Sequence, residues 1–350
     1  MFFEQFANRE VTEMAMPARP ICKKCGQPIY GRYLTTLGAQ WHPEHFICAG
    51  CGLPIREQGF QVHAQQPYHE TCYINQVLPR CAVCGQPIQG RAISIQGDTR
   101  SYHPACYAEH AASRCAYCHK PLLNGYRVDY WGTKYCDEHE KQYPHCVYCS
   151  RLVPPQQQRP GEQEVRCTLC RSEAIETVDE ARPIYMRVRQ WVGAQGLRYN
   201  NLPLSLELCG PEKLATYFPN QARKHLGATL SASSTFGEQI LSTEVTGVAV
   251  LQGLPSSLFA GVAIHELGHV WLIVHGIEHL PTWAVEGFCE LLAYRYYREL
   301  NSLENRYQAE QIERNPDPIY GEGFRRVRAR AEALGFPRFL EQLRTTKRLT

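Results

Sequence analysis

Apolar positions in the second half of the chain repeat with the periods of regular secondary structure. Residues 172–194 place apolar side chains at helical spacing, interrupted at Pro183, and residues 202–208 alternate apolar and polar positions as a half-buried strand does. Residues 228–233 and 246–251 are further strand candidates. The pattern therefore predicts a helix followed by a small sheet.

The longest apolar run, residues 259–274, predicts a buried helix. Pro255 suits its start, where the missing N–H of proline costs little, and Gly276 suits its end. A second apolar helix is expected to begin at Pro281 and to continue through Tyr294. With the small sheet, these helices predict an α+β domain of about 175 residues, which is long enough for its own core.

Three polar residues interrupt the apolar run, within the segment His265-Glu266-Leu267-Gly268-His269. Histidines four residues apart on a helix emerge on the same face, so both rings can bind one zinc ion. The glutamate between them is then free to act as a general base, as in the HExxH motif of metallopeptidases. The alternative is a histidine pair that serves only packing, but a glutamate beside it is costly to bury without a compensating metal or partner.

The helix that begins at Pro281 offers the remaining ligand. Glu286 lies in its early turns, and Glu290 lies one turn further on the same face. Two histidines and one glutamate leave a fourth zinc position open for water. We expect Glu290 to accept the N–H of a zinc-bound histidine and to fix its tautomer. The alternative is a surface glutamate paired with Arg295 or Arg298.

The chain has 17 cysteines, most of which occur in Cys-x2-Cys pairs interleaved with histidines; this is the spacing of metal sites and not of a disulfide framework. Fifteen of them fall into five sets of four structural zinc ligands. The sets are Cys22, Cys25, His42 and His45; Cys48, Cys51, His69 and Cys72; Cys81, Cys84, His103 and Cys106; Cys115, Cys118, Cys136 and His139; and Cys146, Cys149, Cys167 and Cys170. The other two, Cys209 and Cys289, stand in apolar segments and are expected to be buried thiols.

The first two sets match the paired zinc modules of a LIM domain. The aromatic–histidine step at Trp41-His42 and the two-residue link from His45 to Cys48 are typical of that domain, although His45 stands where cysteine is usual. The next two sets form a LIM-like copy whose modules are split by eight residues, and the last set is a half-module. The predicted organisation is a tail (1–20), a LIM domain (21–78), a LIM-like domain (79–142), a four-cysteine half-module (143–172) and the α+β domain (173–350).

The formal net charge of +3 gives no indication of the binding partner. Zinc-bound thiolates, five structural zinc ions and one catalytic zinc ion together bring the metal-loaded chain to neutrality, so nucleic-acid binding is not expected. The N-terminal residues lack a basic stretch followed by an apolar core, and no apolar run is expected to be long enough to span a membrane. A reducing cytoplasm is the expected location.

Five segments of the second half, together with the zinc modules of the first, carry a family resemblance. They are residues 244–246, 251–255, 265–269, 285–289 and 320–325. The chain resembles the LIM-domain-containing, ubiquitin-activated peptidases that restrain organ growth in plants, and their bacterial relatives. The resemblance implies a zinc endopeptidase with gluzincin-like ligands. The 21 residues before Cys22 are too few for the acidic ubiquitin-interacting helices of plant members, so a bacterial-type relative without them is expected and ubiquitin control stays open.

The expected mechanism places zinc on His265, His269 and Glu286, with Glu266 as the general base. Tyr320 is the candidate hydroxyl donor to the oxyanion, from the resemblance and from its position in a glycine-rich turn; the alternative is a core tyrosine. An edge strand above the zinc helix can pair with an extended protein substrate. The LIM-type modules would recruit protein substrates or regulate the enzyme. The alternative function is a LIM-type interaction scaffold with an inactive peptidase domain.

Overall fold

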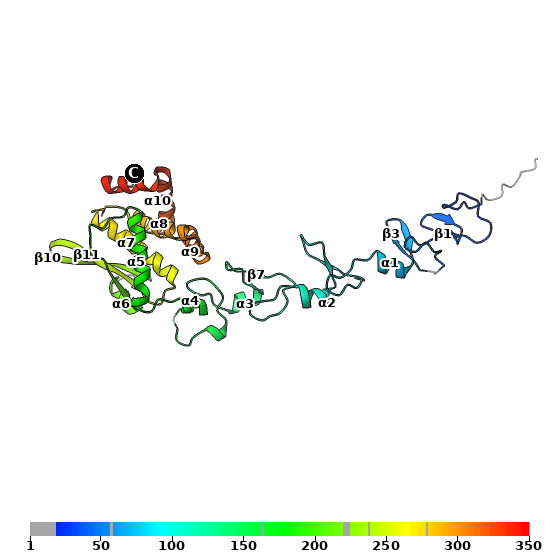
Figure 1. Cartoon of the computed structure of the whole chain (residues 1–350), viewed down its shortest axis with the longest axis horizontal. Coiled ribbons are helices and arrows are strands. Elements are labelled where there is room, and N and C mark those ends of the chain that lie inside the picture. Colours follow the sequence, from blue (N-terminus) through cyan, green and yellow to red (C-terminus); the bar gives the residue numbers. More distant parts are fainter. Residues whose placement is uncertain are drawn as a thin grey trace, which may run out of the picture. The chain divides into compact units, whose positions relative to one another are not determined.

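The computed structural model describes residues 19–56, 59–162, 164–219, 225–236, 239–277 and 279–349. Most of the predicted tail (1–20) therefore lies outside the described residues. The chain divides into two compact units, Met1–Gly125 and Tyr126–Thr350. Figure 1 shows that the first unit consists of short strands, short helices and loops, whereas the second holds all the long helices of the described chain.

The first unit is built from small antiparallel hairpins. Its elements are β1 (Leu34–Thr36), β2 (Ala39–Trp41), β3 (Gln61–His63), β4 (Gln66–Tyr68), α1 (Glu70–Gln76), β5 (Ile93–Ser94), β6 (Ser101–Tyr102), α2 (Pro104–Cys106) and a π-helical turn (Tyr107–Ala111). Its apolar clusters are small: one has only Phe46, Cys48 and Ile55 as fully buried members. Clusters of this size cannot stabilise a fold alone, so the modules need bound metal to fold.

The second unit opens with a cysteine-rich segment. It comprises β7 (Arg127–Val128), β8 (Lys134–Tyr135), α3 (Asp137–Gln142), a 3-10 turn (Pro155–Gln157) and α4 (Thr168–Ser172). We call residues 146–170, which hold the last predicted set of cysteines, the four-cysteine module. Its buried cysteines belong to the same apolar core as the helices that follow. This shared core places residues 143–172 in the second unit. Directly after them, Ile175 exchanges backbone hydrogen bonds with Leu254 (2.9 Å) and Gly253 (2.8 Å).

Helix α5 (Val178–Ala194) starts six residues later than the apolar spacing predicted. Thr177 and Glu180 form a capping box, in which each side chain accepts the other's backbone N–H, and this fixes the start. Pro183 was expected to interrupt the helix, but α5 continues through it. Pro183 is the sixth residue of α5, just past the first turn, so the helix forgoes the one backbone hydrogen bond that an N–H at this position would have made.

The predicted small sheet is confirmed, with three strands in the order β10-β11-β9. They are β9 (Ser205–Cys209), β10 (Gly227–Phe236) and β11 (Gln239–Leu251), with α6 (Pro211–Thr216) between the first two. Strand β11 runs antiparallel to β10 and parallel to β9. Among the described strands, β10 is therefore an edge of the sheet.

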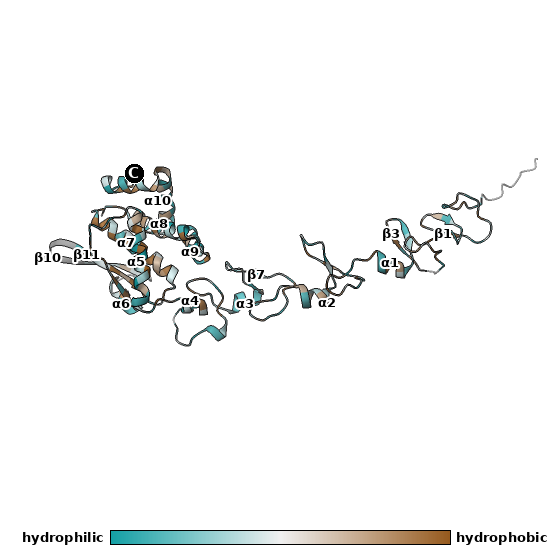
Figure 2. Ribbon diagram, viewed as in Figure 1, coloured by the Kyte–Doolittle hydropathy of each residue, from teal (hydrophilic) through white to brown (hydrophobic). Residues whose placement is uncertain are grey.

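Five helices complete the second unit: α7 (Ser256–Val274), α8 (Thr282–Leu300), α9 (Leu303–Arg314), α10 (Gly321–Leu334) and α11 (Phe336–Thr346). Helix α7 packs against the sheet, α5 and α8, and Figure 2 shows its predominantly apolar colouring. Phe259, Ile264 and Leu267 are completely buried on it. This confirms the predicted buried helix and places its polar segment inside the unit.

The expectation about membrane-spanning runs was wrong for α7. At 19 residues with a mean hydropathy of 1.5, this helix is long and apolar enough to cross a bilayer. However, 61% of this apolar stretch is buried inside the unit. A core helix of a folded domain passes the same test of length and composition, and the buried packing of α7 identifies it as one.

Candidate functional site

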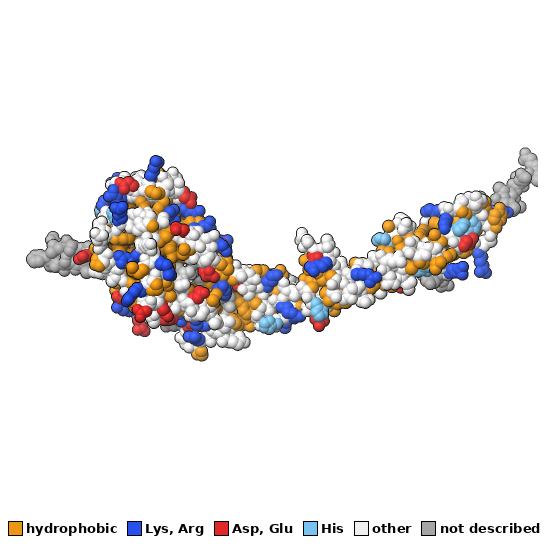
Figure 3. Space-filling view, viewed as in Figure 1, with side chains coloured by type: hydrophobic (Ala, Val, Ile, Leu, Met, Phe, Trp, Pro, Cys, Tyr) orange, Lys and Arg blue, Asp and Glu red, His pale blue; other side chains and the backbone are white. Residues whose placement is uncertain are grey.

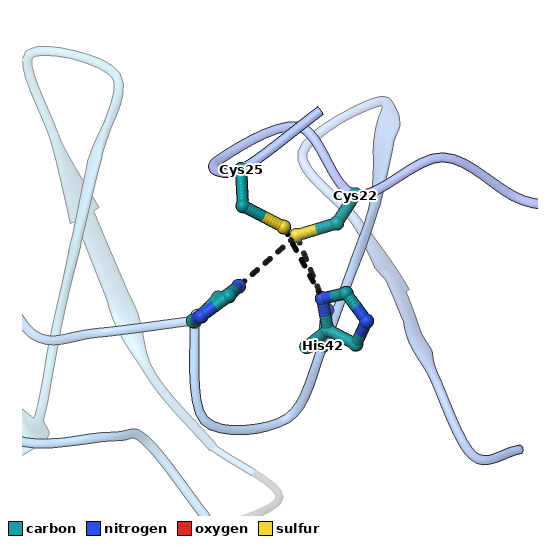
Figure 4. Close-up of side chains that lie close together, drawn as sticks. Cys22, Cys25 and His42 are labelled. Atoms are coloured by element: carbon teal, nitrogen blue, oxygen red, sulfur yellow. Dashed lines mark hydrogen bonds between the residues drawn. The ribbon is translucent and has the colours of Figure 1, made fainter. Parts of the chain in front are cut away.

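In four of the five predicted sets, all members belong to the same unit and their side chains converge. In each, one ligand atom from every member lies within 4.8 Å of the others: Cys22, Cys25, His42 and His45; Cys48, Cys51, His69 and Cys72; Cys81, Cys84, His103 and Cys106; and Cys146, Cys149, Cys167 and Cys170. Figure 4 shows Cys22, Cys25 and His42 of the first set pointing toward one another. These clusters indicate zinc binding at several sites.

The fifth set is divided between the two units. Cys115 and Cys118 belong to the first unit, whereas Cys136 and His139 belong to the second. This zinc site stays a prediction from the ligand spacing.

In three modules, a backbone hydrogen bond to the first cysteine favours its thiolate form. The N–H groups of His42, His69 and His103 donate to the sulfurs of Cys22 (3.4 Å), Cys48 (3.3 Å) and Cys81 (3.5 Å), respectively. Burial would raise the pKa of the Cys22 thiol, but the N–H donors of His42 and Cys25 outweigh it and lower that pKa to about 5. The thiolate is the form that binds zinc, so these modules fit the metal.

The polar segment of α7 meets the start of α8 in a second kind of cluster. His265 Nε2 lies 3.1 Å from Glu286 Oε2 and 3.2 Å from His269 Nε2, and His269 Nε2 lies 3.6 Å from the same carboxylate oxygen. The side chains of His265 and Glu286 are each 15% exposed. Two imidazole nitrogens and one carboxylate oxygen that converge while remaining partly accessible form a donor set that fits zinc with an open position.

The histidine and glutamate side chains of this cluster shift each other's pKa values. Burial would lower the pKa of His265, but hydrogen bonds with Glu286 and Glu290 outweigh it and raise that pKa well above its usual range. Burial would likewise raise the pKa of Glu286, but its contacts with His265 and His269 hold that pKa below its usual range. The Glu286 carboxylate and the His265 imidazole thus favour each other's charged forms, and a bound cation can supply the positive charge that the carboxylate favours.

Glu290 faces the other nitrogen of His265. Its Oε1 lies 3.3 Å from His265 Nδ1, so the ring is held at both nitrogens. Of the two arginines considered as alternative partners, Arg295 donates to Gln195 Oε1 at 2.9 Å and lies over the Phe336 ring.

Glu266 points from α7 toward strand β10. Its side chain is 7% exposed, and Thr229 Oγ1 donates to its Oε2 at 2.9 Å. A Cβ on Gly227 would lie 2.7 Å from Val262 and 2.9 Å from the Glu266 carboxylate, so only glycine lets the strand approach this closely. Sequence reasoning missed both Gly227 and Thr229, because the alternating pattern of a strand gives no sign of which helix it will contact.

Tyr320 reaches the cluster from the start of α10. Its ring stacks on that of His265 with centroids 6.3 Å apart and planes inclined by 18°. Gly321 and Gly323 follow it, and a Cβ on either would collide with backbone, at Asn315 and Trp283 respectively. The glycine-rich segment that the sequence singled out is therefore the close crossing that brings Tyr320 beside His265.

A cavity of about 290 Å³ opens beside His265 and Glu266. Its lining is apolar at Leu226, Leu258, Val262, Ala293 and Ile312, and polar at His265, Glu266, Glu290, Tyr320 and the amides of Gln308, Gln311 and Asn315. No lysine or arginine lines it among the described residues. On the face shown in Figure 3, basic and acidic side chains are interspersed over the second unit, which forms no single-sign surface there.

The two cysteines outside the metal sets are buried, as predicted. Cys209 is 3% exposed and Cys289 is inaccessible. Burial raises the pKa of Cys289 well above its usual range, so this thiol is unsuited to act as a nucleophile.

Comparison with known proteins links both halves of the chain to one group. A family model of the LIM domain matches residues 22–77 and 81–143, and a DA1-like family model, described as Protein DA1, matches residues 212–304. Protein DA1 of Arabidopsis thaliana is 24% identical over 94% of this chain and 68% of its own length. The LIM domain-containing protein HDR3 of Oryza sativa subsp. japonica is 28% identical over 78% of this chain and 55% of its own length.

These similarities extend across the chain but not across the relatives. The chain spans 55% to 68% of the length of the two plant proteins. The LIM domain-containing protein B of Dictyostelium discoideum is 39% identical over 22% of this chain. The chain thus carries LIM domains and a DA1-like domain, and its homologues include the Protein DA1 family of plants.

Proposed function

We propose that the chain is a zinc-dependent endopeptidase that cleaves protein substrates. The observation that carries this proposal is the convergence of His265, His269 and Glu286 beside the buried Glu266. A zinc ion held by the three residues would supply a Lewis acid and lower the pKa of a water molecule. The HExxH segment and the downstream glutamate give this arrangement its gluzincin-like character.

The chain's own residues then divide the work of proton transfer and positioning. Glu266 accepts the proton of the attacking water and passes it to the leaving amine, while Thr229 orients its carboxylate. Tyr320 donates its hydroxyl proton in a hydrogen bond to the developing oxyanion, from its place beside His265. Glu290 holds His265 through Nδ1, which leaves Nε2 for the metal.

Substrate binding uses the edge of the sheet and the cavity. Strand β10 is an edge strand whose start touches Glu266, so an extended substrate can pair with it and present a peptide bond to the cluster. LIM domains generally mediate protein–protein interactions, and those of the first unit would recruit the substrate or regulate its access.

The proposal is tested by incubating zinc-loaded full-length protein with a cell extract and sequencing the new N-termini by mass spectrometry. Cleavages made by the wild type should be absent with Glu266→Gln. Glu212→Gln serves as the control, because it makes the same change at an exposed position on α6. If the wild type and Glu266→Gln gave the same N-termini, the chain would be an interaction scaffold and not a peptidase.

A further inference from the structure

Helix α9 is a wall of the cavity beside Glu266. Gln308, Gln311 and Ile312 on α9, and Asn315 directly after it, all line the cavity. Three of these four side chains are uncharged amides, which can donate to and accept from a ligand. The histidines and Glu266 come instead from α7, and Glu286 comes from α8. Helix α9 therefore shapes the space for a substrate without supplying any ligand of the candidate metal centre.

The same helix is attached to the four-cysteine module. The hydroxyl groups of Ser150 and Tyr307 are hydrogen-bonded at 2.8 Å, across 157 positions of the sequence. Gln308 Nε2, from a cavity-lining residue, approaches the backbone oxygen of Tyr148 at 3.5 Å. Tyr307 is only 4% exposed, so its hydroxyl group would be costly to bury without this partner.

An aromatic cluster reinforces the attachment. The rings of Tyr130 and Trp131 each lie 5.0 Å from the ring of Tyr307. Trp131 Nε1 donates to the backbone oxygen of Cys149 at 2.8 Å, and Arg151 lies 3.7 Å over the Trp131 ring. Tyr307 is thus enclosed between the segment before the module and the module itself.

Ser150 occupies a backbone position that favours glycine. It follows the second cysteine of its module and has φ +56°, in the left-handed region. The corresponding residues of three other modules are glycines: Gly26 (φ +70°), Gly52 (φ +73°) and Gly85 (φ +72°). A serine here bears backbone strain that glycine would not, and its hydroxyl is the group that contacts Tyr307.

We propose that the four-cysteine module is a positioning element of the substrate cleft, which holds α9 through Ser150 and Tyr307 so that the amide wall keeps its place beside Glu266. Ser150 and Tyr307 are positioning residues: neither lines the cavity. They act on how tightly a substrate with an uncharged side chain fits the cavity. The part of the proposal that concerns substrate rests on the proposed peptidase function, whereas the attachment of α9 does not.

The attachment is tested by hydrogen exchange of the zinc-loaded full chain, followed by mass spectrometry. Ser150→Gly removes the hydroxyl and relieves the left-handed strain, so the module should keep its zinc. Peptides from α9 should nevertheless exchange about fivefold faster, the factor expected from losing one net hydrogen bond. Tyr307→Phe should give the same change. The double variant should exchange little faster than either single variant, because both substitutions remove the same hydrogen bond.

Tyr217→Phe is the matched control, since Tyr217 donates to Glu207 Oε1 at 2.9 Å, away from α9. It should leave the exchange of α9 unchanged. Unchanged exchange of α9 in both Ser150→Gly and Tyr307→Phe would overturn the proposal. So would a uniform increase over the whole second unit, because that result would indicate general destabilisation.

The consequence for substrate is measured with a short fluorogenic peptide that the wild type cleaves. Ser150→Gly should raise KM about fivefold and leave kcat within about twofold, because the wall moves while the metal ligands stay. A fall in kcat at constant KM would contradict a role in substrate positioning. If the wild type cleaved no peptide at all, the peptidase proposal would fail, while the exchange experiment would still decide the attachment of α9.

Discussion

Gly287 of α8 and Gly323 of α10 face each other where the two helices cross. A Cβ on Gly287 would collide with the backbone of Gly323, and a Cβ on Gly323 would collide with the backbone oxygen of Trp283. Glu286 precedes the first glycine, and Tyr320 caps the helix that carries the second. The crossing therefore sets how close Tyr320 comes to the candidate metal centre.

Gly323→Ala should force α8 and α10 apart. Overpacking of this kind typically costs about 1–3 kcal/mol, so we expect the free energy of unfolding to fall by that amount. Urea denaturation of the second unit, followed by circular dichroism, measures the change. Gly193→Ala on α5 is the control: a Cβ there meets nothing within 4 Å, so the same substitution should leave stability equal or higher. Equal stability of both variants would show that the helices tolerate a wider crossing.

Tyr320→Phe should show whether Tyr320 donates a hydrogen bond to the oxyanion or only packs in the core. The phenylalanine ring keeps the stacking on His265 but has no hydroxyl to donate. We expect kcat to fall by about 10²-fold or more, with zinc content and stability close to those of the wild type. Steady-state kinetics on a verified peptide measures the fall. Wild-type kcat in this variant would assign Tyr320 to packing.

Gln311→Glu should change which substrate side chain the cavity accepts. The cavity has no lysine or arginine among its described lining residues, and Gln311 lies at its exposed side. A new carboxylate there should favour peptides with lysine over those with glutamine by about fivefold, the effect of a partly exposed ion pair. Competition between a lysine peptide and the matched glutamine peptide measures the ratio of their kcat/KM values. Gln142→Glu, at an exposed position on α3, should leave the preference unchanged.

Metal content should follow the ligand sets. Five cysteine–histidine sets and the cluster on α7 and α8 predict about six zinc ions per chain. A chelator should remove the ion at His265, His269 and Glu286 first, because its coordination is open to solvent, while the cysteine-bound ions remain. Elemental analysis before and after brief chelation measures both values. A starting content near one would contradict the structural zinc sites.

The sequence predicted the parts of the molecule that depend on local spacing. Four of the predicted cysteine–histidine sets and the buried helix with its polar segment follow from periodicity and ligand spacing, and the structure contains them. The three strands were also predicted, but β9 begins three residues later than predicted and β11 begins seven residues earlier. Glu290 beside His265 follows in the same way, because residues four apart share a helix face.

Contacts between segments far apart in the chain could not be predicted, because they leave no regular spacing in the sequence. Nothing in the spacing of residues 225–236 indicates that Gly227 and Thr229 approach Glu266, and nothing near Ser150 indicates Tyr307. The start of α5 was missed because capping by Thr177 outweighed the apolar spacing. The sequence analysis did not recognise that α7 is long and apolar enough to span a membrane. Its two histidines and its glutamate interrupt the apolar run, but the mean hydropathy of the helix stays high.

Glu266→Gln provides the most direct test of the account, when zinc content and peptide turnover are measured on the same preparation. Glutamine keeps the shape of the side chain and can still interact with Thr229, but it cannot accept the proton of water. We predict full zinc content with turnover lowered by several orders of magnitude. Turnover close to that of the wild type, with zinc retained, would contradict the assignment of Glu266 as the base and with it the proposed peptidase mechanism.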